Sequence, residues 1–120
     1  MINGLTSPAA QAVGFVLGAV IICLITLTPV DQLPLVPGTD KLYHIIGFGG
    51  WALLCAFGPI KRFHILSVLI IFSGGAIELI QPYVNRYAEW MDFYANALGV
   101  ILVALSRFTI SRFLKSKSKV

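Results

Sequence analysis

The sequence predicts an all-α fold, a four-helix transmembrane bundle in a polytopic membrane protein that forms one domain over residues 1–120. Hydrophobic residues make up 58% of the chain and charged residues only 12%, about half the share in a typical soluble domain. So few charges cannot cover the surface of a water-soluble monomer. A disordered chain is also excluded, because such chains are poor in apolar residues and rich in charge.

Four apolar stretches have the length of about 20 residues that a helix needs to cross a bilayer. We predict spans at residues 9–28, 41–58, 65–81 and 91–108. Prolines lie between these spans, where they cost no helical hydrogen bond: Pro29 follows the first, Pro59 the second and Pro82 the third. No basic residue precedes the first span and no small-residue cleavage site follows it. We therefore expect a retained helix rather than a signal peptide.

Basic residues predict the topology. With four spans, both chain termini lie on one side of the membrane, together with the connection between the second and third spans. Seven of the nine Lys and Arg residues fall on that side: Lys61, Arg62, Arg107, Arg112, Lys115, Lys117 and Lys119. Because Lys and Arg concentrate in cytoplasmic loops, we expect both termini in the cytoplasm. The basic tail at residues 109–120 fits this topology and nearby anionic headgroups, and no motif indicates a nucleic acid partner.

Polar side chains inside the spans are the candidate functional residues, because ionisable groups are costly in a membrane. They form three pairs with a spacing of three or four residues: Asp40 and His44, Glu78 and Gln81, Asp92 and Asn96. Each pair therefore shares one helix face. The second span starts, the third ends and the fourth starts on the outer side, so we expect all three pairs in one polar pocket near the outer membrane face.

A structural interpretation of the same residues stays open. Asp40 and Asp92 are favoured residues for capping the starts of helices. Asn96 is suited to hydrogen bonding between membrane helices, and small residues such as Gly14 and Gly99 allow close helix packing. The polar residues could thus form a helix–helix network rather than a binding site.

The order and spacing of these residues resemble a known family. An Asp-Lys-x-x-His pattern occupies residues 40–44, and a Glu-x-x-Gln helix end follows at residues 78–81. A connection containing Arg86 then leads to Asp-x-x-x-Asn-x-x-Gly at residues 92–99. In roughly residues 38–105, the chain resembles the VanZ-like family of small bacterial membrane proteins. It departs from the family at Glu89 and Trp90, where a small residue is frequent.

The resemblance implies a protein of the bacterial cytoplasmic (inner) membrane with a role in the cell envelope. The family is named for an accessory protein linked to glycopeptide antibiotic resistance. The resemblance also implies that the polar positions act together.

Two classes of function remain. In the first, the pocket binds a lipid or envelope headgroup through eight candidate residues: Asp40, Lys41, His44, Glu78, Gln81, Arg86, Asp92 and Asn96. Lys41 and Arg86 are suited to a phosphate group. His44, Glu78 and Asp92 are the candidate catalytic residues if the protein is an envelope-lipid hydrolase or transferase, although no nucleophile is evident.

No cofactor is evident from the sequence, but a divalent cation such as Mg²⁺ or Mn²⁺ is possible. Its ligands would be the oxygen-rich set with one imidazole: Asp40, His44, Glu78 and Asp92. In the second class of function, the protein is a non-enzymatic interaction or assembly partner of envelope machinery. The sequence leaves the oligomeric state open.

Overall fold

A computed structural model describes residues 7–27, 40–84 and 89–118, and these residues form helices and no strand. The four α-helices are α2 (Pro8–Thr26), α3 (Asp40–Cys55), α4 (Ile60–Ile80) and α5 (Trp90–Ser118). A short 3-10 helix, η2 (Gln81–Val84), directly follows α4. The predicted all-α fold with four helices is confirmed.

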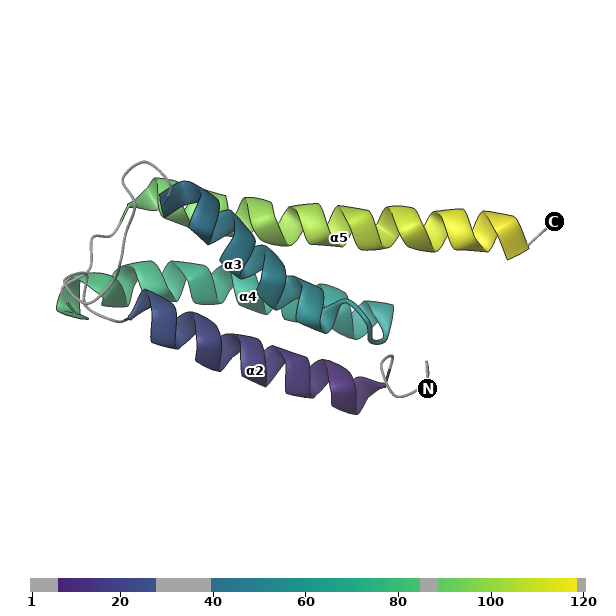
Figure 1. The fold of residues 1–120 in the computed structure, drawn as a ribbon, viewed down its shortest axis with the longest axis horizontal. Coiled ribbons are helices and arrows are strands. Elements are labelled where there is room, and N and C mark those ends of the chain that lie inside the picture. The colour runs from purple at the N-terminus through teal and green to yellow at the C-terminus, as the bar shows by residue number, and fades with distance from the viewer. Residues whose placement is uncertain (1–6, 28–39, 85–88, 119–120) are drawn as a thin grey trace.

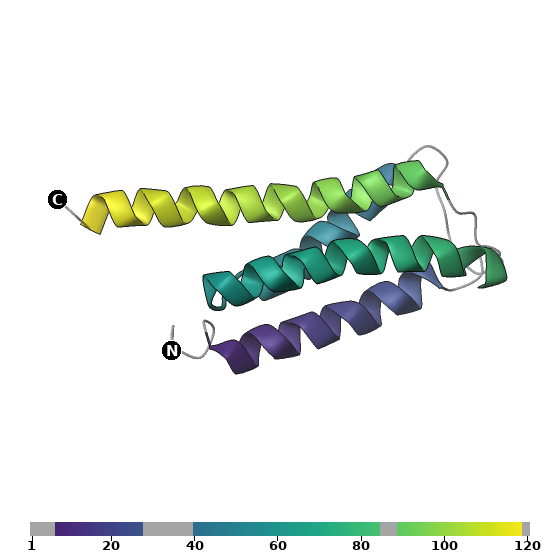
Figure 2. The same cartoon turned by 180° about the vertical axis from the view of Figure 1, so that it is seen from behind.

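The four helices run alternately in opposite directions along the long axis of the molecule (Figure 1). Helix α3 crosses the bundle obliquely and packs against all three other helices, most extensively against α5. On the opposite face, α4 lies between α2 and α5 (Figure 2). The start of α3, the end of α4 and the start of α5 therefore share one end of the bundle. The start of α2 and the α3–α4 turn share the other end.

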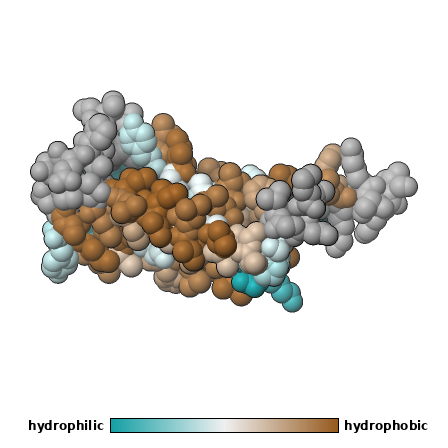
Figure 3. Space-filling model, turned by 60° about the horizontal axis from the view of Figure 1, so that its bottom comes forward, coloured by the Kyte–Doolittle hydropathy of each residue, from teal (hydrophilic) through white to brown (hydrophobic). Residues whose placement is uncertain are grey.

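Three helical segments in the described part of the chain are long and apolar enough to cross a membrane: Pro8–Thr26, Ile60–Val84 and Trp90–Leu114. Helix α3 has 16 residues and is about 24 Å long, so it is shorter than these segments. Apolar side chains cover the middle of the face shown in Figure 3, and hydrophilic residues lie towards its two ends. This distribution is that of a helical membrane protein.

Three helix boundaries differ from the predicted spans by three residues or more. Helix α4 begins at Ile60, five residues earlier than expected, and the Phe63 N–H donates to the Pro59 carbonyl at 2.9 Å. Helix α3 ends at Cys55, ahead of the Gly-Pro sequence at residues 58–59. Helix α5 continues through the predicted basic tail to Ser118, because that segment contains neither Gly nor Pro to break the helix.

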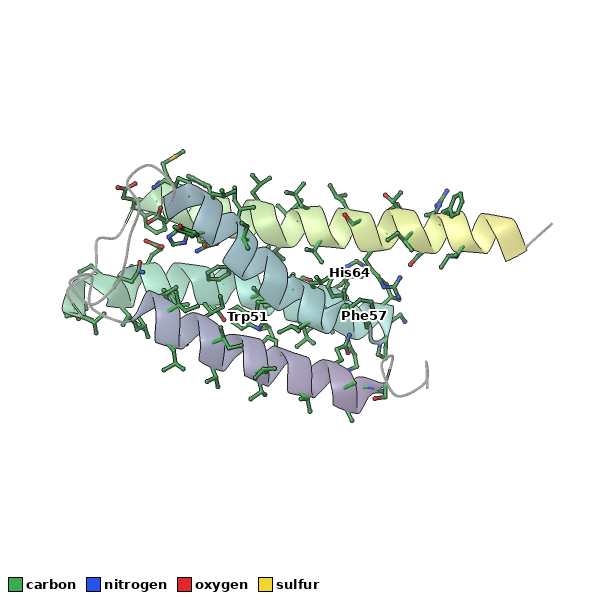
Figure 4. The ribbon with its side chains drawn as sticks, in the orientation of Figure 1. Trp51, Phe57 and His64 are labelled. Atoms are coloured by element: carbon green, nitrogen blue, oxygen red, sulfur yellow. The ribbon has the colours of Figure 1, made fainter. Side chains whose placement is uncertain are left out.

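The core lies where α3 packs against α2, α4 and α5. Phe48 and Trp51 are its largest buried side chains on α3, and the Trp51 indole N–H donates to the Phe15 carbonyl of α2 at 3.0 Å. Figure 4 shows Trp51 between these two helices. Gly14 lies against the backbone of Leu54, and Gly99 against that of Ile45. The close packing expected at these two glycines is confirmed.

Candidate functional site

Polar side chains gather at the end of the bundle where α3 and α5 begin and α4 ends. Six described residues form this group, which we call the charged cluster: Lys41, His44, Glu78, Glu89, Asp92 and Asn96. Three helices and the residue before α5 contribute to it. Alternating helix directions bring them to one level, as the sequence predicted.

Lys41 joins α3 to the start of α5. Its Nζ donates to Asp92 Oδ1 at 2.6 Å and to Glu89 Oε2 at 2.8 Å. The Asp92 side chain is only 9% exposed, whereas the Glu89 side chain is 57% exposed. Lys41 thus connects a sheltered carboxylate with a carboxylate at the edge of the cluster.

Asp92 is the third residue of α5, in the first turn of that helix. A negative charge is favoured there by the helix dipole. Its two oxygens contact two α3 side chains, since Oδ1 accepts from Lys41 and Oδ2 lies 3.5 Å from His44 Nε2. Asp92 therefore links two helices as well as stabilising the start of its own.

His44 lies between Asp92 and Asn96, and both of its ring nitrogens face protein groups. Its Nδ1 donates to Asn96 Oδ1 at 2.7 Å, and its Nε2 faces Asp92 at 3.5 Å. The side chain is mostly buried. Because neither nitrogen is left open, His44 is better suited to positioning the two α5 residues than to taking a proton from a substrate.

Glu78 differs from the other two catalytic candidates in having an oxygen without a partner. Its Oε2 accepts from the Glu89 backbone N–H at 3.1 Å. Its Oε1 is buried and has no hydrogen-bond partner, although the residue is only 4% exposed. A buried carboxylate oxygen is costly unless it is paired, so Glu78 is the residue of the cluster most in need of a further contact.

Asn96 has a similar unmatched atom, its Nδ2 donor, and the residue is 1% exposed. This nitrogen lies 3.2 Å from the position that a Cβ on Gly74 would occupy. Gly74 and Glu78 are four residues apart, so they lie on the same face of α4. The unmatched donor therefore faces α4 one helical turn away from Glu78.

Gln81 is buried but is directed elsewhere. Its Nε2 donates to the Thr26 carbonyl at the end of α2, at 3.1 Å. It thus joins η2, directly after α4, to α2 and makes no described hydrogen bond with the charged cluster. The side chain of Asp40 and the whole of Arg86, both predicted site residues, lie outside the described part of the structure.

Among the described residues, no group of three or more His, Cys, Asp or Glu side chains is arranged to hold a metal ion. His44, Glu78 and Asp92 therefore do not by themselves form the cation site considered from the sequence. The contacts that they make are hydrogen bonds and ion pairs to protein groups.

Sequence reasoning missed the role of two residues at the opposite end of the bundle. Gln11 of α2 donates from Nε2 to the carbonyls of Cys55 and Pro59, at 3.0 and 3.2 Å. Arg107 of α5 donates from Nε to the Ala56 carbonyl at 2.9 Å and also contacts Ser111. We call Gln11, Arg107 and these three carbonyls the hairpin cluster. The sequence feature that points to this role is Gln11 itself, a single amide side chain near the start of an otherwise apolar stretch.

In comparisons with known proteins, no family model, no curated protein and no solved structure matches the chain.

Proposed function

We propose that this protein is a cell-envelope membrane protein of the VanZ-like type that binds a lipid headgroup at the charged cluster. The observation that carries this proposal is Glu78 Oε1, a buried carboxylate oxygen without a hydrogen-bond partner. It belongs to a cluster whose outer members, Lys41 and Glu89, are 36% and 57% exposed at the side chain. A polar group arriving from the membrane interface would therefore meet charged side chains first and the unmatched oxygen behind them.

Binding without chemistry is the form of this function that the contacts favour. Both nitrogens of His44 and both oxygens of Asp92 already face protein groups. Among the three catalytic candidates, only Glu78 has a side-chain atom without a hydrogen-bond partner. Glu78 could serve as a general acid or base, but a reaction would also need a nucleophile, which none of the three candidates supplies.

For the location, we propose a bacterial inner membrane with both termini in the cytoplasm. The start of α2 and the far end of α5 lie at the same end of the bundle, which supports this topology (Figure 1). The exposed basic residues Lys61, Arg62 and Arg112 belong to that end as well. Reporters fused before Met1 and after Val120 test the proposal: activity of a periplasmic reporter at either terminus contradicts it.

The binding proposal is tested by replacing three residues singly: His44→Ala, Glu78→Gln and Asp92→Asn. We expect each variant to accumulate in the membrane, and Glu78→Gln to lose most of the lipid that co-purifies with the wild type. Lipid analysis of purified protein measures the loss, and the amount of protein in the membrane is the control. Unchanged lipid in the Glu78 variant contradicts the proposal.

A second function has its own supporting observation. The ion pairs and hydrogen bonds of the charged cluster join α3 to the start of α5 and α4 to Glu89. Such a network would fix the helix positions in a non-enzymatic assembly partner of envelope machinery. In that case the His44 and Asp92 variants fail to accumulate, and the wild type retains no lipid selectively.

A further inference from the structure

We propose that the headgroup bound at the charged cluster ends in a primary ammonium group whose N–H hydrogens are accepted by Glu78 Oε1. This inference rests on the proposed function and names the ligand class for the same site. The probe that carries this chemistry is phosphatidylethanolamine.

Charge is the first argument. The charged cluster contains three carboxylates, those of Glu78, Glu89 and Asp92, and two basic side chains, those of Lys41 and His44. Lys41 Nζ lies within 2.8 Å of both Glu89 and Asp92, and His44 Nε2 lies 3.5 Å from Asp92. The Glu78 carboxylate instead accepts from the Glu89 backbone N–H. A further cation is therefore favoured beside Glu78, whereas an anionic group there would lie close to three carboxylates.

Hydrogen bonding is the second argument. Glu78 accepts one hydrogen bond, from the Glu89 backbone, and its buried Oε1 accepts none. An ammonium group supplies both a compensating charge and an N–H donor. A quaternary ammonium supplies the charge but no N–H, so it would leave Oε1 unmatched.

The order of unmatched atoms along the bundle is the third argument. Glu78 lies at the last turn of α4, and Asn96 Nδ2 faces Gly74, one turn deeper. In a phospholipid the terminal ammonium is outermost, and the phosphate and ester oxygens lie closer to the acyl chains. When the ammonium group binds Glu78, the phosphate and ester oxygens of the same lipid lie deeper in the bundle. One of these oxygens can then accept a hydrogen bond from the unmatched Asn96 Nδ2.

The experiment uses the full chain in detergent micelles and compares lipids with identical acyl chains. Lipid retained by the protein is measured by native mass spectrometry. Phosphatidylethanolamine is compared with its mono-, di- and trimethylated forms, because each added methyl group removes one N–H while the charge stays. We expect retention to fall along the series, by about tenfold between the unmethylated and trimethylated forms, as for loss of a charged hydrogen bond.

Variants assign the effect to Glu78. We expect Glu78→Leu, which removes the acceptor oxygens together with the charge, to bind all four lipids alike. The matched control is Gln11→Leu, which loses hydrogen bonds at an equally buried position in the hairpin cluster and should keep the preference of the wild type. The methylation series on the wild type stands alone if the Glu78 variant does not fold.

Three results overturn the inference: equal retention across the methylation series in the wild type, stronger retention of anionic phosphatidylglycerol, or a preference that persists in Glu78→Leu. Competition by Mg²⁺ that a chelator reverses would do so as well, since it would make a metal ion the ligand. The proposed function survives these results if any lipid is retained selectively. It fails if no phospholipid is retained above the level of the surrounding micelle.

Discussion

At the hairpin cluster, polar side chains donate to backbone carbonyls, whereas at the charged cluster they mainly contact one another. Gln11 and Arg107 reach three carbonyls at the end of α3 and in the turn after it. Lys41 and His44 instead contact the side chains of α5 and the residue before it. The two ends of one bundle thus use buried polar groups for different purposes.

The hairpin cluster has a structural cause. The last carbonyls of a helix have no partners within the helix, and a membrane supplies little water to replace them. Helix α3 is short, so its end needs donors from neighbouring helices, and α2 and α5 provide them. No comparable backbone requirement explains the charged cluster. Buried atoms without a partner occur at both ends, Gln11 Oε1 as well as Glu78 Oε1 and Asn96 Nδ2, but among the described residues only Glu78 has such an atom on a carboxylate. This difference is why we place the ligand at the charged cluster.

The largest effect is expected from Gly99→Ala, which tests whether the charged cluster depends on close packing of α3 and α5. A Cβ at this position would lie 2.3 Å from the Ile45 carbonyl oxygen, so the helices must separate. We expect a loss of about 3 kcal/mol in the free energy of unfolding, the upper range for overpacking. Selective lipid retention should be lost with it. Reversible unfolding in mixed micelles measures the first quantity.

Gly50→Ala is the matched control for Gly99→Ala. Gly50 is on α3, and a Cβ there has no atom within 4 Å. Its substitution should leave stability unchanged or raise it by less than about 1 kcal/mol, the helix propensity difference. Equal destabilisation by both variants would mean that α3 and α5 do not approach closely at Gly99.

Gln11→Leu separates the two ends of the molecule. Two carbonyls lose their donor, so we expect the free energy of unfolding to fall by about 2 kcal/mol. Lipid preference should stay as in the wild type, because the hairpin cluster lies at the other end of the bundle. A change in lipid preference without a loss of stability would show that the hairpin cluster takes part in binding.

The sequence predicted the helices and the level of the polar residues, for identifiable physical reasons. Apolar runs interrupted by prolines mark the helices. Alternating helix directions then require that Lys41, Glu78 and Asp92 meet at one end. These inferences need only the length of a span and the order of the spans along the chain.

Side-chain partners were beyond the sequence because they depend on helix rotation. Glu78 and Gln81 are three residues apart, which places them about 60° apart around α4. That difference suffices to direct Glu78 towards the start of α5 and Gln81 towards the end of α2. Gln11 escaped notice because an uncharged amide changes the hydropathy of a span very little. Gln11 is important because α3 ends beside it, at Cys55, where backbone carbonyls need a donor.

Double-mutant cycles on Lys41 compare a sheltered contact with an exposed one inside the charged cluster. We expect Lys41→Met combined with Asp92→Asn to show a coupling energy of about 1–2 kcal/mol, since Asp92 is well shielded from solvent. Lys41→Met combined with Glu89→Gln should show less than about 0.5 kcal/mol, as for a surface ion pair. Unfolding free energies of the single and double variants provide both values. A larger coupling to Glu89 would contradict the assigned geometry.

The smallest effect is expected from Arg112→Gln, which lies outside both clusters. The Arg112 guanidinium lies 5.7 Å from the centre of the Phe108 ring on the same helix, and both residues are exposed. An exposed cation–π contact contributes about 0.5 kcal/mol, so stability should fall by no more than that. This contact lies within α5 and joins it to no second helix, and its loss leaves no buried polar atom without a partner. The hydrogen bonds of Gln11 and Glu78, by contrast, connect separate segments of the chain and involve buried atoms. A loss of stability as large as that of Gln11→Leu would contradict this prediction. It would mean that Arg112 also contacts a segment outside α5 and contributes to stability in the same way as the residues of the hairpin cluster.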